Sequence, residues 1–202
     1  MLIKDVFKEI IVGYNITNST TKNDYAKRYK TLQKDSIQYT NIIKDKLIEK
    51  NFTSEVKDKY FMKPRDILIF VKRPYRVGTY TYGDNIELVI PNNFIVLRNI
   101  DMNKYSYIFV ANYLEKVIME KFKKDNTKKG NLSIGEIEDI ELPDISKDKQ
   151  MTISPLLKSI NKRSAIYSNI LENDDKIIRY AINSIVGDID EWFIKRYRRI
   201  WK

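Results

Sequence analysis

Apolar residues form a heptad repeat through the last third of the chain, and this pattern constrains the fold more than any other feature. From residue 153 to residue 185 the spacings alternate between four and three residues, which is typical of a helix that packs along one stripe against another helix. The stripe, called the seam below, comprises Ile153, Leu157, Ile160, Tyr167, Leu171, Ile178, Ala181 and Ile185, with Ser164 and Asp174 as polar interruptions.

The seam predicts one long helix over about 146–186. Ser154 before Pro155 is one candidate cap, and Ser146 before an earlier turn that Pro155 then kinks is the other. Gly187 is the expected end. So long a seam exposes more apolar surface than a small domain covers, so we favour a contact with another helix, in a homodimer or with another subunit. The alternative is packing on the chain's own sheet.

Two short apolar runs earlier in the chain, residues 66–71 and 93–97, predict strands because they are rich in β-branched and aromatic residues and lie between turn-forming residues. Residues 105–123 then change to helical spacing. Residues 29–61 are ambiguous and hint at one or two helical turns near Ile42 and Leu47. We predict an α/β (α+β) domain over 1–145, the long helix over 146–186, and a basic aromatic tail over 187–202.

The residue types that are absent exclude several functions. The chain has no His and no Cys, which excludes Ser-His and Cys-His nucleophile pairs, ordinary zinc sites and disulfides. None of the six glycines lies in a nucleotide-binding phosphate loop. No apolar run approaches the roughly 18 to 20 residues that span a bilayer. We therefore expect a soluble cytoplasmic protein with no cofactor, no metal and no membrane contact.

A loose nuclease pattern is the enzymatic alternative. Asp144, Asp174 and Lys176 match a formula that gathers carboxylates around Mg²⁺ beside a lysine. Chance matches are expected in a chain in which 32% of residues are charged. Asp174 also lies on the seam of a helix rather than on a strand, so a solvated or register-setting role is favoured over metal binding.

Positive charge is abundant and clustered. The 37 Lys and Arg against 27 Asp and Glu give a formal charge of +10, which favours a polyanionic partner. Residues 22–34, 59–76 and 121–129 each hold five or six bases and one acid, and the first two windows also contain tyrosines. Such loops suit phosphate anchoring and base reading, although a solvated surface charge is the alternative for any single residue. The candidate DNA contacts are Lys72, Arg73, Tyr75, Arg76, Tyr80, Tyr82, Lys22, Arg28, Lys128 and Lys129.

The order of the segments resembles the specificity subunits of type I restriction-modification systems. Residues 64–78 are similar to the family's Gly-Asp-Ile-Leu segment, with Arg65 in place of its glycine, and residues 93–98 and 107–114 are similar to its next strand and helix. Residues 130–143 are similar to the exit from its target recognition domain, and Gln150 stands where the family places the glutamine that opens its spacer helix. Residues 6–13 and 29–37 are similar to its opening segments.

The resemblance implies a target recognition domain with a small mixed sheet and flanking helices, which reads double-stranded DNA, and a coiled-coil spacer helix. Complete members hold two of each, whereas this chain has room for one of each and is similar to a half subunit. Such a half would act as a homodimer through the seam, on a palindromic bipartite site. The resemblance implies no catalysis in this chain and a methyltransferase subunit as partner, and it leaves open whether a restriction subunit also joins. A scaffold or decoy that occupies the methyltransferase without reading DNA is the remaining alternative.

Overall fold

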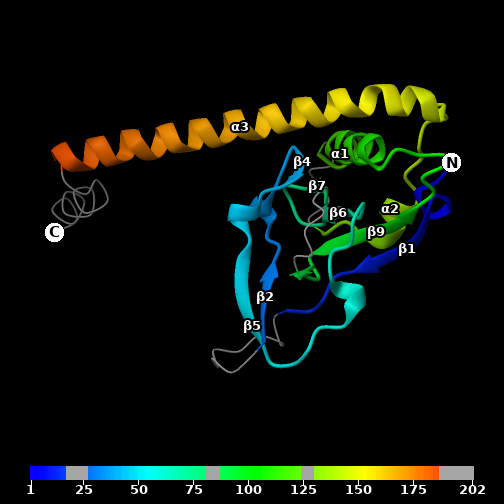
Figure 1. Ribbon diagram of the computed structural model, residues 1–202, viewed down its shortest axis with the longest axis horizontal. Helices are drawn as coiled ribbons and strands as arrows, with labels where there is room; N and C mark the ends of the chain where they lie inside the picture. Colours follow the sequence, from blue (N-terminus) through cyan, green and yellow to red (C-terminus); the bar gives the residue numbers. More distant parts are fainter. Residues whose placement is uncertain (17–26, 81–86, 124–129, 187–202) are drawn as a thin grey trace. The chain divides into compact units, whose positions relative to one another are not determined.

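The computed structural model describes residues 1–16, 27–80, 87–123 and 130–186 (Figure 1). The expectations for Lys22, Tyr82, Lys128, Lys129 and the tail lie outside the described residues. The chain falls into two compact units that divide after Lys162. The long helix α3 (Lys147–Val186) begins in the first unit and continues into the second.

The first unit contains two mixed sheets. The larger has the strand order β1-β9-β6-β7-β4-β3, and the smaller has the order β5-β2-β8. Neighbouring strands are antiparallel except β4 with β7 and β2 with β8, which are parallel. The strands are β1 (Phe7–Val12), β2 (Lys27–Thr31), β3 (Ile37–Gln38), β4 (Thr40–Ile42), β5 (Ile48–Phe52), β6 (Ile67–Phe70), β7 (Arg76–Thr79), β8 (Leu88–Val89) and β9 (Phe94–Ile100). This architecture, with a long C-terminal helix, confirms the predicted fold class.

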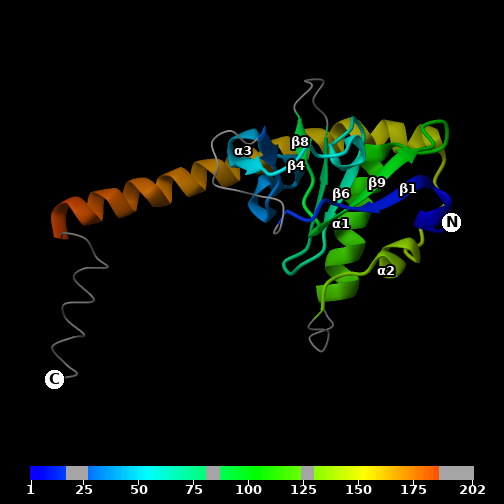
Figure 2. The same ribbon diagram turned by 90° about the horizontal axis from the view of Figure 1, so that it is seen from below.

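Helices cover one face of the larger sheet. They are α1 (Tyr107–Lys123) and α2 (Ile134–Glu138). Elsewhere in the unit, the described residues also form short 3₁₀ turns at Ile3–Asp5, Lys34–Ser36, Lys44–Lys46 and Asp58–Tyr60. Figure 2 shows α1 beside β6 and β9. Strand β6 is buried on both faces because Ile67 and Ile69 pack into the cluster that includes α1, while Leu68 and Phe70 pack into a second cluster with Leu88 of the smaller sheet. The all-apolar run that predicted this strand is therefore a central strand.

Residues 29–61 form short strands and 3₁₀ turns, and the hint of one or two helical turns near Ile42 and Leu47 corresponds to a single 3₁₀ turn, Lys44–Lys46. Ile42 belongs to β4, and Leu47 ends the turn Lys44–Lys46. Their apolar side chains lie against the core from strand edges rather than along a helix face.

The long helix starts at Lys147, so Ser146 rather than Ser154 precedes it, and Pro155 lies in its interior. Ser154 is buried, and its hydroxyl donates to the Gln150 carbonyl at 2.6 Å. The helix is described as far as Val186, and the expected end at Gly187 lies outside the described residues. Among the described residues, no helix is both long and apolar enough to cross a membrane.

Buried hydrogen bonds fix the first turns of α3 to the domain. Gln150 is fully buried, and its Oε1 accepts from the Ser106 amide at 3.0 Å. Its Nε2 donates to the carbonyls of Lys104 at 3.2 Å and Ile145 at 2.8 Å. Three turns further on, Asn161 Nδ2 donates to Asn112 Oδ1 at 2.7 Å and to Thr40 Oγ1 at 2.6 Å. The helix start is thus part of the first unit's polar interior.

Candidate nucleic-acid interface

A pocket of about 690 Å³ lies where the two sheets of the first unit meet. The smaller sheet and the turn after β2 contribute one wall, and the end of β6 and the turn before β9 contribute the other. We call it the cleft. Its polar lining residues are Thr31, Gln33, Lys34, Asp35, Lys50, Lys72, Asn92 and Asn93.

The cleft is positively charged, with three lysines and one aspartate. Lys34 Nζ lies 3.5 Å from Asp35 Oδ1, so the Asp35 carboxylate partly neutralises the positive charge of Lys34. Among the described residues, neither Lys50 nor Lys72 has an ion-pair partner. Two ammonium groups are therefore available to a phosphate backbone.

The turn before β9 adds two asparagine side chains to the cleft. Asn93 is partly exposed, but its Oδ1 is buried and has no hydrogen-bond partner. Asn92 is exposed, and only its backbone amide is used, donating to the Tyr14 carbonyl at 2.8 Å. Gln33 differs, because its Nε2 donates to the Lys46 carbonyl at 3.0 Å. Among the described residues, no hydrogen bond uses the side-chain amide of Asn92 or Asn93.

Of the predicted DNA contacts that lie within the described residues, only Lys72 lines the cleft. Arg73 is exposed in the loop between β6 and β7, where its Nε lies 3.3 Å from the Tyr75 hydroxyl. Arg76 is partly buried in β7, with its Nη1 donating to the Tyr75 carbonyl at 3.2 Å. Arg28 is exposed on β2, one position from Tyr29, so it projects from the face opposite to Tyr29 and Thr31. Thr31 lines the cleft, so Arg28 faces away from it.

Tyr75 and Tyr80 are core residues, each 5% exposed, and this argues against the base contacts expected of them. Tyr75 packs in the cluster beneath α1, and Tyr80 packs in the cluster between the sheets. The sequence pattern is the same whether the ring of a loop tyrosine faces solvent or the core. Both rings are buried here because burying their large apolar area is favourable.

Sequence reasoning singled out only Lys72 among the eight polar residues of the cleft, and it missed Lys34, Lys50, Asn92 and Asn93 together with Thr31, Gln33 and Asp35. Lys34 ends a basic window, and Asn92 follows a proline in a turn, so the sequence weakly indicated a role for both residues. Lys50 and Asn93 carried none, because their place in the cleft depends on long-range strand pairing.

The seam on α3 is exposed in the described chain. Within the second unit, Tyr167, Leu171 and Ile178 are 62%, 69% and 57% exposed, and Ile185 is 84% exposed. Ala181 is also exposed, and in the first unit Ile153 and Ile160 are exposed while Leu157 is partly buried. A row of exposed aliphatic side chains of this length marks an interaction surface.

No observation favours the nuclease alternative. Among the described residues, no group of three or more acidic side chains could hold a metal ion. Lys176 Nζ pairs with Glu172 Oε1 at 3.1 Å, one helical turn away. Asp174 is exposed on the helix.

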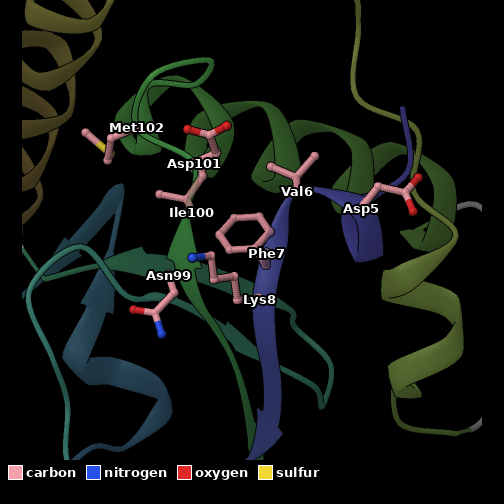
Figure 3. Close-up of a pocket in the computed structure, with 8 residues that line it drawn as sticks. All are labelled: Asp5, Val6, Phe7, Lys8, Asn99, Ile100, Asp101 and Met102. Carbon is pink, nitrogen blue, oxygen red and sulfur yellow. The ribbon is translucent and has the colours of Figure 1, made fainter.

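A second pocket, of about 670 Å³, lies at the start of β1 and the end of β9 (Figure 3). It is lined by two carboxylates, Asp5 and Asp101, and by one lysine, Lys8. The Asp101 carboxylate accepts from the Asn103 amide at 3.0 Å, and the Asp5 carboxylate accepts from the Leu2 amide at 3.3 Å. Its charge does not suit a polyanion, so the cleft is the better candidate.

Comparison with solved structures finds the same fold in type I restriction-modification proteins. A chain from work on complex assembly and conformational transition of the type I R-M system matches 94% of this chain with a TM-score of 0.59 and 17% identity. The HsdS subunit from Thermoanaerobacter tengcongensis matches 94% with a TM-score of 0.55 and 16% identity. The type I restriction-modification S subunit from M. genitalium matches 98% with a TM-score of 0.50 and 18% identity.

This chain spans about half the length of those structures, covering 46%, 45% and 48% of them in the same order. No protein-family model matches the sequence, and no curated protein matches it either. The chain therefore has the fold of half a specificity subunit, as the resemblance of its segments predicted.

Proposed function

We propose that this chain is a half specificity subunit, which recognises a DNA sequence for a type I restriction-modification methyltransferase and carries no catalytic activity of its own. The observation that carries the proposal is the fold match over almost the whole chain to about half of each specificity subunit. The match includes one sheet domain and one long helix, which is the content expected of one half. The +10 charge and the lysines of the cleft support a DNA partner.

The missing half would be a second copy of the chain. The exposed seam, from Ile153 to Ile185, supplies the apolar surface that such a helix-to-helix contact buries. A twofold dimer would present two identical recognition domains, so its target would be palindromic and bipartite. The proposal includes domain boundaries near residues 145 and 186. It also takes the same helix of a second copy as the partner of the seam.

A binding experiment tests the proposal. The purified protein, alone and with the methyltransferase subunit, is incubated with a library of random duplexes, and bound sequences are recovered at several salt concentrations. We expect a palindromic bipartite motif and an affinity that falls steeply with salt. Binding to the methyltransferase without enrichment of any sequence would instead support the decoy alternative. Magnesium-dependent cleavage abolished by Asp174→Ala would support the nuclease.

A further inference from the structure

The cleft holds a polar group that the fold leaves unsatisfied. The Asn93 Oδ1 is buried without a hydrogen-bond partner, although nearly all buried polar atoms in folded proteins have one. The Asn93 side chain lines the cleft, and no hydrogen bond from a described residue fixes its amide, so rotation about its last torsion can turn the amide toward a ligand there. The Asn93 amide can thus offer a ligand one hydrogen-bond donor and one acceptor at the wall of the cleft.

The surroundings of Asn93 indicate the chemistry of the ligand. Lys50 and Lys72 line the same cleft with no ion-pair partner among the described residues, and they suit phosphates on either side of a base. Asn92, the neighbouring residue, brings a second amide. An asparagine amide matches the major-groove edge of adenine, because its oxygen accepts from N6 and its nitrogen donates to N7.

We propose that Asn93 determines sequence specificity by reading an adenine through both atoms of its amide, while Lys50 and Lys72 bind the flanking phosphates. This inference rests on the proposed function, since it names the residue by which the recognition domain reads DNA. Asn93 selects the base, and the lysines strengthen binding to every sequence alike.

Motif selection from random duplexes tests the inference in the full-length chain. Asn93→Asp keeps the shape of the side chain but replaces its donor with an acceptor, which pairs with the cytosine N4 amino group. We expect one adenine in each half-site to be replaced by cytosine, with roughly 5- to 100-fold weaker binding to the original site. We expect Asn93→Ala to accept any base at that position. Asn103→Ala, at an exposed asparagine outside the cleft, is the matched control and should keep the motif.

The lysines are tested by the salt dependence of binding. Lys72→Ala should weaken binding to all sequences and reduce the salt slope by about 0.9, whereas Lys8→Ala, in the other pocket, should leave both unchanged. Thermal unfolding of each variant separates a loss of binding from a loss of folding. An unchanged motif in folded Asn93→Asp and Asn93→Ala would overturn this inference while leaving the proposed function intact. The absence of any motif for the wild-type chain with its methyltransferase would overturn both.

Discussion

Arg98 and Asp66 form a buried, two-pronged ion pair between β9 and the residue that precedes β6. Arg98 Nε donates to Asp66 Oδ1 at 2.9 Å, and Nη2 donates to Oδ2 at 2.7 Å, with the side chains 4% and 1% exposed. The guanidinium also donates to the carbonyls of Lys59 at 3.1 Å and Phe61 at 2.7 Å. The aspartate of the family-like Asp-Ile-Leu segment therefore has a structural role, because it holds the smaller sheet's connection to the larger sheet.

Asp66→Ala should be strongly destabilising, since it leaves the Arg98 charge buried and unpaired. We expect a loss of about 3 to 5 kcal/mol in the free energy of unfolding, measured with urea. Asp58→Ala removes the carboxylate that pairs with Lys63 at 2.6 Å on the surface, and it should change stability little. Equal effects of the two substitutions would contradict the structural role of the buried pair.

Arg65 has a φ of 69°, in the left-handed region that glycine adopts without strain. Arg65 therefore holds a backbone conformation that a side chain disfavours and that glycine would adopt without strain. Arg65→Gly should therefore stabilise the protein by about 0.5 to 1 kcal/mol in urea unfolding. Lys57, exposed with a φ of −66°, is the control, because Lys57→Gly relieves no strain and should not stabilise.

Gln150→Ala should loosen the attachment of α3 to the domain. The substitution leaves the Ser106 amide and the carbonyls of Lys104 and Ile145 without their partner, and it leaves a small cavity. We expect a loss of about 2 to 4 kcal/mol in the free energy of unfolding. Lys149→Ala, at the exposed neighbouring position, should have little effect. A tolerated Gln150→Ala would show that the helix start does not depend on these bonds.

Glu115 on α1 makes stability depend on pH. Burial raises the pKa of its carboxyl from 4.5 to about 7, and the positive charge of Arg76 opposes this only in part. The folded state holds the proton more tightly than the unfolded state, so this contribution to stability is complete below about pH 4.5 and is lost as the pH rises to about 7.

Glu115→Gln should remove that dependence, giving a smaller drop in melting temperature between pH 5 and pH 8 than the wild type shows. The comparison with the wild type is needed because burial also raises the pKa of Asp66. Glu120→Gln, at an exposed position on the same helix, controls for the loss of a surface charge. Parallel pH profiles for wild type and Glu115→Gln would refute the assignment.

Elements formed by one continuous stretch of sequence could be predicted from the spacing of their apolar residues. The all-apolar run near residue 66 became β6, and the seam runs along most of α3. The cleft could not be predicted in the same way, because Lys50, Lys72 and Asn93 are far apart in the sequence. They meet through pairings such as β2 with parallel β8, whose partners are separated by 58 residues at Lys30 and Leu88. Charge and loop position alone could not separate the buried Tyr75 from the exposed Lys72.

The seam carries the prediction of self-association. Leu171→Lys places a charge in the middle of the row of exposed aliphatic residues, so it should convert a dimer to a monomer without unfolding the sheet domain. Light scattering after gel filtration measures the mass, and circular dichroism checks the fold. Asn183→Lys adds the same charge on the opposite side of the helix and should leave the dimer intact. A wild-type chain that is monomeric at high concentration would contradict the dimer, and the seam would then be the surface for another subunit.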